Sequence, residues 1–273
     1  MSVSDKVVTG ASGVGLFSWA TNRLYGRLTD AAYNKYAKVY KPAGIVSIIV
    51  PAFNEEEYIE KTLKSILSQN IILECPDYFE CIVVDNESTD RTAEIAKQYC
   101  QVIFAPRGKL NARHKGILEA SGDIIVACDA DCYYPPNWLN LLLRPFHDQE
   151  VIAVHGNLLY PGNFLDKLFR VWTINLLPFA YSKIMSGANA AFKKDIYFKV
   201  GGFDLSINQS DIEEMLIEEE IVFLGKLKHF GKVIFNIQAI CFAATRSGGR
   251  KALIEQRLAQ SKYQQEVARG ERF

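Results

Sequence analysis

Two hydrophobic patterns alternate along the chain from residue 44 onward. Short runs of β-branched and other apolar residues are typical of buried strands. Between them lie segments whose apolar residues recur every three or four positions, as on one face of a helix. The expected strands are 44–51, 79–85, 102–105 and 123–129, and the expected helices are 55–69, 89–99 and 111–120. This alternation predicts an α/β fold in which a mostly parallel sheet is covered by helices on both faces.

Polar and charged residues gather where each expected strand ends. They are Asn54, Glu55, Asp85, Asp90, Arg107, Lys109, Arg113, Asp129 and Asp131. Because ligands bind at the carboxyl ends of parallel strands, these side chains are expected to converge on one crevice. Glu55 and Asp90 also lie in first helical turns, where an acid stabilises the helix dipole without any further role.

Asp129 and Asp131 are separated by one residue, so in an extended segment their side chains point the same way. Two crowded carboxylates repel each other unless a cation or hydroxyl donors relieve them. Oxygen ligands favour Mg²⁺ or Mn²⁺, which complete their coordination shells with waters and substrate phosphates. Arg107, Lys109 and Arg113, just upstream, are suited to neutralise such a diphosphate. The alternative is that Asp131 caps a helix before "PPNW", since D-x-D alone is a weak motif.

Composition limits the remaining classes of function. The chain has 31 basic and 31 acidic residues, so no global positive field favours a nucleic-acid partner. The six cysteines show neither C-x-x-C pairs nor zinc-ligand spacing, which indicates reduced thiols. No secretion leader and no apolar run of roughly 18 residues is recognisable, so we expect a cytoplasmic location without a membrane-spanning helix.

The N-terminal segment contains a glycine pattern, "VVTGASGVGL", that resembles a dinucleotide-binding loop. No buried strand precedes its glycines, so a flexible arm is the preferred interpretation. Residues 16–41 interleave aromatic and basic side chains, which predicts a basic amphipathic arm over residues 1–43. Such an arm either contacts a membrane surface at its cytoplasmic face or packs on protein, including a second subunit of a homodimer.

Three segments carry a resemblance to a known family. "VSIIVPAFNEEEYIEKTLKSILSQ", "VVDNESTDRTAEIA" and "DIIVACDADC" look like the family-2 glycosyltransferases with the GT-A fold, and "SGANAAFKKDIYFKVGGFD" resembles their acceptor-side segment. The resemblance covers about residues 44–245. It implies a Rossmann-like sheet and a metal-dependent enzyme, using Mn²⁺ or Mg²⁺. That enzyme transfers a sugar, with inversion, from a nucleoside diphosphate sugar to a hydroxyl or a lipid phosphate. A UDP-sugar is favoured and a GDP-sugar is the second choice.

The same resemblance implies a division of the chain and roles for individual residues. Residues 44–132 correspond to a nucleotide-binding half, 133–245 to an acceptor half, and 246–273 to a basic C-terminal tail helix. The implied nucleotide-binding residues are Pro51, Ala52, Phe53, Glu55, Asp85, Lys109, Arg113 and Asp129, with Asp131 and Asp129 on the metal and Gly187 and Asn189 on the acceptor side. Glu87 stands where the family usually has glycine, which leaves the preferred base open.

The catalytic base of such an enzyme is expected from an acidic pair near a helix. By distance to Gly231, the pair corresponds to Glu219 and Glu220, with Glu218 one residue away. Adjacent helical residues are about 100° apart, so only one or two of these glutamates can face the cleft. The competing interpretation is a solvated acidic turn.

Further expectations concern the C-terminal basic segment and the acceptor. Arg246 and Arg250 in "TRSGGRK" are expected to close over the donor diphosphate, since Arg donates two parallel hydrogen bonds. The apolar segment "FLDKLFRVWTINLLPFAY" favours a lipid-linked acceptor over a carbohydrate one. Two other classes of function remain. A sugar nucleotidyltransferase would need a glycine-rich basic loop after the first strand, and an inactive sugar-nucleotide-binding protein is disfavoured because the expected acids are present.

Overall fold

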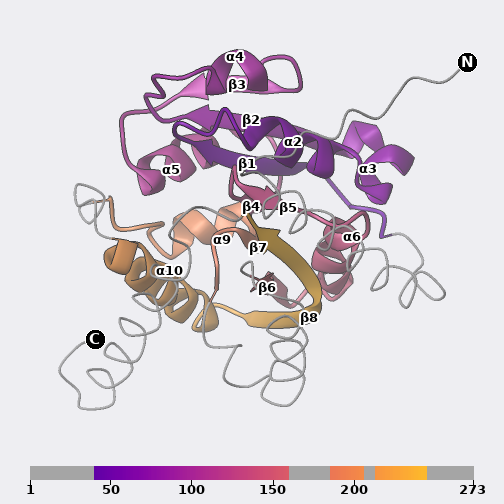
Figure 1. Cartoon of the computed structure of the whole chain (residues 1–273). Helices are drawn as coiled ribbons and strands as arrows, with labels where there is room; N and C mark the ends of the chain where they lie inside the picture. Colours follow the sequence, from indigo (N-terminus) through magenta and orange to yellow (C-terminus); the bar gives the residue numbers. More distant parts are fainter. Residues whose placement is uncertain (1–39, 160–184, 206–212, 245–273) are drawn as a thin grey trace, which may run out of the picture.

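One sheet runs through the part of the chain that the computed structural model describes, residues 40–159, 185–205 and 213–244 (Figure 1). Within these residues the strand order is β3-β2-β1-β4-β7-β6-β8-β5. The strands are β1 Val46–Ala52, β2 Phe79–Asp85, β3 Gln101–Phe104, β4 Ile124–Cys128, β5 Cys132–Tyr133, β6 Val151–Leu159, β7 Asn189–Lys193 and β8 Lys232–Ala243. The α-helices are α2 Ile59–Leu67, α3 Asn70–Glu74, α4 Thr92–Ala96, α5 Lys109–Glu119, α6 Trp138–Leu143, α9 Lys194–Lys199 and α10 Glu213–Lys228. Short 3₁₀ turns span Pro76–Tyr78 and Arg144–His147.

The first half of the sheet is parallel and agrees with the sequence pattern. β1 pairs in parallel with β2 and β4, and β2 pairs in parallel with β3. Every residue of β1 is buried, because helices cover both of its faces. Ile48 and Val50 pack in a cluster with α2, whereas Ile49 points the other way and packs in a cluster with α5. Alternate residues of β1 therefore pack into two apolar clusters, one on each face of the sheet. The expected α/β class is confirmed.

The second half of the sheet is mixed. β7 runs antiparallel to both β4 and β6, whereas β8 runs parallel to β6 and antiparallel to β5. Figure 1 shows the half with β1, β2 and β3 at the top and the half with β8 and α10 below it. The short β5 follows the Asp129–Asp131 segment directly and pairs with the end of β8 through Cys132 and Ala243. This pairing joins the D-A-D segment to both halves.

Helices α5 and α10 lie on the same face of the sheet, although about 100 residues separate them. Leu110 and Ile117 of α5 belong to the same apolar cluster as Phe223, Leu224 and Leu227 of α10. Shared packing on one face is what brings the polar residues of these two helices together. None of the helices in the described residues is both long enough and apolar enough to span a bilayer.

Candidate active site

The carboxyl ends of β1 and β2 meet and are joined by their loops. Ala52 pairs with Asp85, and the Asn86 amide donates a hydrogen bond to the Ala52 carbonyl (2.9 Å). Asn54 and Glu87 both have positive φ angles, 52° and 63°, in the left-handed region that glycine adopts most readily. The conformation of Glu87 agrees with the expectation that a glycine usually stands at this position.

Asp85 presents a carboxylate oxygen that is buried without a partner. Its Oδ2 accepts a hydrogen bond from the Ser88 amide (3.2 Å), but its Oδ1 has none among the described residues. Asn86 next to it also has a buried Oδ1 without a hydrogen bond among these residues. Buried acceptors without donors are costly, so both oxygens are suited to bind N–H groups of a ligand.

Phe53 and Arg107 form a small platform next to these strand ends. The guanidinium carbon of Arg107 lies 4.2 Å from the centroid of the Phe53 ring, which is cation–π geometry. Arg107 is exposed and Phe53 is half-buried, so the pair is open to solvent on one side. Pro51 and Ala52 are buried within β1 and supply the wall behind it.

Glu55 and Asp90 organise the loops after β1 and β2. The Glu55 amide donates to the Thr92 hydroxyl (2.7 Å), and the Glu56 amide donates to Asp90 (3.1 Å). Burial raises the pKa of Asp90, but hydrogen bonds from Thr92 and the loop amides outweigh burial and lower it below its ordinary value. Asp90, as a carboxylate, therefore ties the two loops together. Glu55 and Asp90 both precede their helices, since α2 begins at Ile59 and α4 at Thr92, so the expectation that they lie in first helical turns is wrong.

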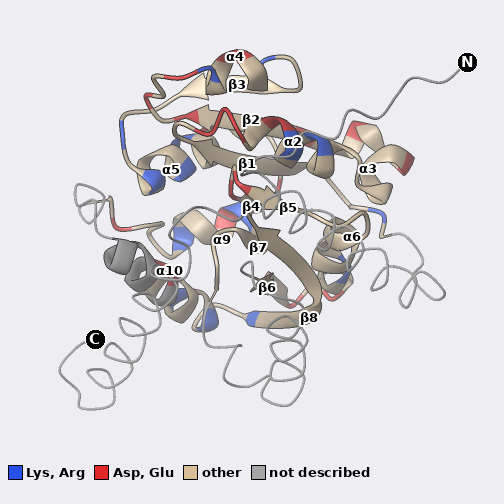
Figure 2. Cartoon of the chain, in the orientation of Figure 1, with Lys and Arg blue, Asp and Glu red and all other residues tan. Residues whose placement is uncertain are grey.

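Asp129 lies between two cations of α5. Its Oδ1 is 2.8 Å from Nη2 of Arg113, and its Oδ2 is 3.0 Å from Nζ of Lys109. Burial opposes ionisation of Asp129, but Lys109 and Arg113 outweigh it, so its pKa is lowered. Figure 2 marks the basic residues of α5 and the acidic connection between β4 and β5. The α5 cations thus hold Asp129 as a carboxylate before any ligand arrives.

Three side chains around the D-A-D segment lie close enough to share a metal ion. Ligand atoms of Asp129, Asp131 and Cys132 lie within 4.8 Å of one another. A hydrogen bond with Cys241, and then burial, raise the pKa of the Cys132 thiol well above its ordinary value. The two carboxylates supply the oxygen ligands that Mg²⁺ and Mn²⁺ prefer over sulfur.

Backbone contacts hold the D-A-D segment in place. The Thr62 hydroxyl of α2 donates to the Ala130 carbonyl (2.8 Å), and the Asp129 amide donates to the Tyr134 hydroxyl (2.9 Å). Sequence reasoning missed both contacts. Thr62 lies within an otherwise ordinary amphipathic helix, and nothing in its neighbours indicates a distant partner. The helix-cap alternative for Asp131 is not observed, because α6 begins at Trp138 with Asn137 as its N-cap.

Glu220 lies on the inward face of α10. It precedes Phe223, Leu224 and Leu227 by three, four and seven residues, and all three are buried. Its Oε1 is 2.8 Å from Nη1 of Arg113 and accepts a hydrogen bond from the Gly187 amide (2.9 Å). Arg113 therefore joins Glu220 of α10 to Asp129 after β4 within one cluster.

The remaining expected residues fall into two groups. Asn189 is fully buried: its amide nitrogen donates to the carbonyls of Asn157 and Ala239, and its oxygen accepts from Trp138. These three contacts give Asn189 a role in the core of the acceptor half. The other group lies outside the described residues. It consists of the side chains of Glu218 and Glu219, Arg246 and Arg250, most of the segment 1–43, and the segments 160–184 and 246–273.

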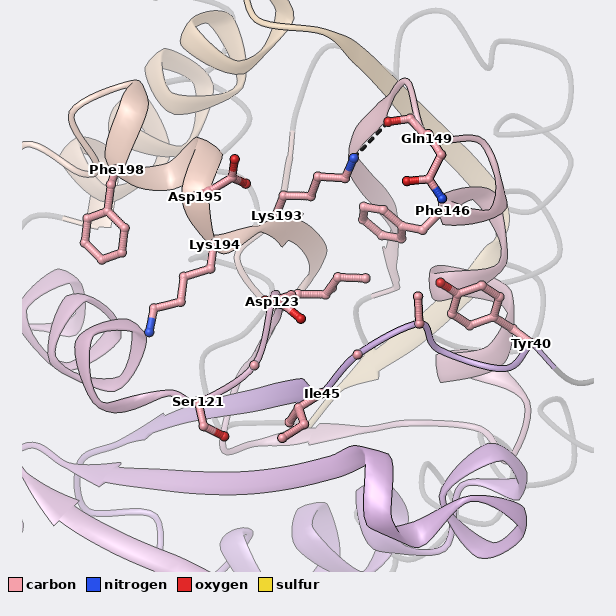
Figure 3. Close-up of a pocket in the computed structure, with 14 residues that line it drawn as sticks. Tyr40, Ile45, Ser121, Asp123, Phe146, Gln149, Lys193, Lys194, Asp195 and Phe198 are labelled. Carbon is pink, nitrogen blue, oxygen red and sulfur yellow. Dashed lines mark hydrogen bonds between the residues drawn. The ribbon is translucent and has the colours of Figure 1, made fainter.

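A pocket elsewhere in the molecule contains none of the expected site residues. It lies before the amino ends of β1 and β4, where Ile45, Ser121 and Asp123 line it together with Lys193 and Lys194 (Figure 3). Lys193 and Lys194 donate to the carbonyls of Gln149 and Ala120. The pocket is at the opposite end of the strands from Asp85 and Asp129.

The chain is similar in sequence to several known glycosyltransferases. It is 29% identical over 208 residues to the probable glycosyltransferase YdaM of Bacillus subtilis, covering 66% of this chain and 47% of that protein. It is 31% identical over 166 residues to the dolichol-phosphate mannosyltransferase of Pyrococcus furiosus, covering 58% and 45%. The glycosyltransferase AglE of Haloferax volcanii is 30% identical over 171 residues, covering 58% and 55%. The chain thus spans about half the length of these relatives.

Solved structures agree on the fold. A mannosyltransferase from Pyrobaculum calidifontis, solved with GDP-Man and Mn²⁺, aligns with a TM-score of 0.60 at 23% identity, over 89% of this chain and 70% of that chain. The glucosyl-3-phosphoglycerate synthase of Mycobacterium tuberculosis, solved with Mn²⁺, UDP-glucose and phosphoglyceric acid, aligns with a TM-score of 0.52 at 20% identity, over 81% and 76%. These alignments confirm the expected GT-A fold.

The family follows from a direct match to the sequence. The profile described as "Glycosyl transferase family 2" matches residues 47–210. This match includes β1, β2, the D-A-D segment and β7. Since it covers more than half of the chain, this protein belongs to glycosyl transferase family 2.

Proposed function

We propose that the protein is an inverting, metal-dependent glycosyltransferase that uses a nucleoside diphosphate sugar. The observation that carries this proposal is the cluster in which one buried guanidinium, that of Arg113, contacts both Asp129 and Glu220. It joins the acid of the D-A-D segment to a glutamate on the acceptor side. An inverting transfer to a hydroxyl acceptor uses a base on the face of the sugar opposite the leaving diphosphate, and Glu220 is the candidate for that base.

The nucleoside is proposed to bind at the ends of β1 and β2. The buried Oδ1 of Asp85 accepts hydrogen bonds only, and we propose that it accepts one from the ring N–H that uracil and guanine have and that cytosine and adenine lack. The Phe53–Arg107 platform offers a flat surface against which a base can stack. Both observations support a UDP-sugar or a GDP-sugar as the donor.

A divalent ion is proposed to bind Asp131 together with Asp129. Asp131 and Asp129 offer the oxygen ligands that such an ion prefers, and the ion would supply positive charge to offset that of the leaving diphosphate. Lys109 and Arg107 are both accessible to solvent, and we assign them to the phosphates. Arg246 and Arg250 remain candidates for closing over the same group.

Glu220 is proposed to be the general base. Its Oε1 is occupied by Arg113 and the Gly187 amide, whereas no hydrogen bond from a described residue reaches Oε2. Oε2 takes the proton of the acceptor hydroxyl as that oxygen bonds to the anomeric carbon. The bond from this carbon to the phosphate oxygen breaks at the same time, and the nucleoside diphosphate leaves with the electron pair. Attack from the opposite face inverts the configuration.

The acceptor is proposed to be linked to a lipid. Curated relatives include the dolichol-phosphate mannosyltransferase of Pyrococcus furiosus and a glucosyl-dolichyl phosphate glucuronosyltransferase of Haloferax volcanii. The sequence adds the apolar segment "FLDKLFRVWTINLLPFAY" and the basic amphipathic arm over residues 1–43, which suit a membrane surface. An acceptor phosphate is already ionised and would not need Glu220.

The experiment is turnover of purified protein with Mn²⁺ and a panel of sugar nucleotides, with glucosyl-dolichyl phosphate as a hydroxyl acceptor and, separately, with dolichyl phosphate. Transfer with release of UDP or GDP is expected, whereas release of pyrophosphate would indicate a nucleotidyltransferase. Glu220→Gln should lower turnover to a hydroxyl acceptor about 10²- to 10⁴-fold, the usual contribution of a general base. Glu119→Gln, which changes an exposed glutamate of α5, is the matched control. Full activity of Glu220→Gln with a hydroxyl acceptor would exclude Glu220 as the base.

A further inference from the structure

Arg113 occupies a position that a phosphate-binding arginine would not occupy. It lies on the inward face of α5 with Leu110 and Ile117, and only 2% of its side chain is exposed. Its two terminal nitrogens are each 2.8 Å from a carboxylate, on Asp129 and on Glu220. A donor phosphate would have to compete with two carboxylates for a guanidinium that solvent hardly reaches.

The charge of Arg113 is balanced within the protein. The carboxylates of Asp129 and Glu220, each 2.8 Å from a terminal nitrogen, compensate the buried positive charge of the guanidinium. Arg113 is therefore a permanent cation between two acids. Removal of one member of such a buried group leaves an uncompensated charge, which is strongly destabilising.

Gly187 fits against the guanidinium. A Cβ atom at residue 187 would lie 2.1 Å from Nη1 and 2.2 Å from Cζ of Arg113, so the guanidinium would have to shift away from its two carboxylates. The Gly187 amide also donates to the same Oε1 of Glu220 that Arg113 contacts. The backbone at residue 187 thus forms one wall of the Arg113 site and supplies a second donor to Glu220.

We propose that Arg113 is a positioning residue, which holds Glu220 at a fixed place relative to Asp129, and that Gly187 is required because it leaves room for the guanidinium. This inference rests on the proposed function of Glu220 as the base. Both terminal nitrogens of the planar guanidinium are used: Nη2 contacts the acid on the donor side and Nη1 the acid on the acceptor side, whereas the buried Nε has no hydrogen-bond partner among the described residues. Two contacts, from Arg113 and from the Gly187 amide, hold Oε1 of Glu220. They fix the orientation of the carboxylate, so that Oε2 faces the acceptor. In this proposal Lys109 and Arg107 bind the phosphates, and Arg113 does not.

A conservative substitution tests the fork geometry. Arg113→Lys keeps the positive charge but provides a single ammonium group, which cannot reach both carboxylates in the same way. Release of UDP from UDP-glucose and of GDP from GDP-mannose is measured with Mn²⁺. We expect kcat to fall about 10²-fold, the cost of a displacement near 1 Å, while the KM for the donor stays close to that of the wild type. Arg91→Lys, at an exposed ion pair on α4, is the control and should leave both constants unchanged.

A glycine pair provides an independent variant. Gly187→Ala should lower kcat as Arg113→Lys does, because the methyl group displaces the guanidinium. Gly225→Ala is the matched control, since a Cβ at this position in α10 meets no atom within 4 Å. Equal activity of the two alanine variants would contradict the proposed requirement for glycine at residue 187.

A double-mutant cycle separates positioning from a merely structural role. If Arg113 acts through Glu220, Arg113→Lys should cause little further loss of kcat in a protein that already carries Glu220→Gln. Additive losses would overturn the proposal, and so would a raised donor KM with unchanged kcat, which would show that Arg113 acts through Asp129 alone. If Glu220→Gln reduces kcat and Arg113→Lys does not, the base assignment stands and the positioning role is wrong.

Two outcomes concern the proposed function itself. If Glu220→Gln is fully active, both the base and its positioning are refuted. If the wild type transfers no sugar, the ion pair between Arg113 and Glu220 can still be tested by thermal unfolding. The proteins compared are the wild type, Arg113→Lys, Glu220→Gln and the variant with both substitutions. Additive changes in unfolding free energy would refute the bridge between residues 113 and 220, whereas coupled changes would support it apart from any activity.

Discussion

Asp85 ends β2 with one carboxylate oxygen bound to the Ser88 amide and the other buried without a partner among the described residues. At the scale of the single residue, this free acceptor predicts the choice of base. UDP and GDP should bind in the presence of Mn²⁺, whereas CDP and ADP should bind weakly, because cytosine and adenine present a ring acceptor where uracil and guanine present a donor.

Asp85→Ala is expected to weaken binding of UDP or GDP by about 10- to 100-fold, since a hydrogen bond to a charged group contributes roughly 1.5–3 kcal/mol. Isothermal titration calorimetry with each nucleotide measures the change. Asp77→Ala, at an exposed aspartate in the turn before β2, should bind like the wild type. If Asp85→Ala binds UDP and GDP as tightly as the wild type does, the base contacts other residues.

At the scale of the element, the parallel strands are tied together at their amino ends by one acid. Glu80 of β2 accepts hydrogen bonds from the Ser47 hydroxyl of β1 and from the Ser121 amide (2.7 Å) before β4. Burial raises the pKa of Glu80, but these hydrogen bonds outweigh burial and lower it below its ordinary value of 4.5. A lowered folded pKa gives stability that is present above the ordinary value and is lost as the pH falls through the folded value.

Glu80→Gln should therefore unfold at a lower temperature than the wild type at neutral pH, and this difference should shrink between about pH 5 and about pH 3. Thermal unfolding followed by circular dichroism over this range measures it. Glu74→Gln, an exposed position on α3, is the control and should follow the wild type at every pH. Parallel curves for Glu80→Gln and the wild type through the acid range would show that Glu80 does not link the strands.

At the scale of the whole molecule, charge predicts where a membrane contact must lie. The chain has equal numbers of acids and bases, and Figure 2 shows both signs on both halves of the described structure. A membrane contact must therefore be local, and the basic aromatic arm over residues 1–43 is the candidate. We expect the full chain to float with vesicles that contain anionic lipid, and a version lacking residues 1–41 to remain in the soluble fraction.

Added salt should weaken flotation of the full chain, because interactions between exposed charges are screened. The truncated version must keep the circular dichroism spectrum of a folded α/β protein for the comparison to hold. Negligible flotation of both versions would refute the membrane contact and favour packing of the arm on protein. Sedimentation of the two versions would then report whether the arm joins two subunits.

The sequence by itself determined the local elements and which residues end them. β2 matches its expected range, and β1, β3, β4 and α5 differ from theirs by one or two residues at each end, because periodicity and strand-ending polar residues are local properties. The family resemblance rests on the same segments, and the match to residues 47–210 confirms it. Convergence of Asp85 and Asp129 on one end of the sheet followed from the parallel order of their strands.

Only the tertiary structure decided how distant residues pair. Periodicity does not encode strand direction, so the antiparallel β7 and the return of β5 to β8 were not foreseeable. Residue type alone also could not show that Arg113 is buried between two carboxylates whereas Arg107 is exposed, because burial depends on how the helices pack. Glu220 is distinguished from a solvated acid by the packing of α10 against the face that also carries α5. Contacts between residues about 100 positions apart depend on strand order and helix packing, and these are properties of the folded chain as a whole.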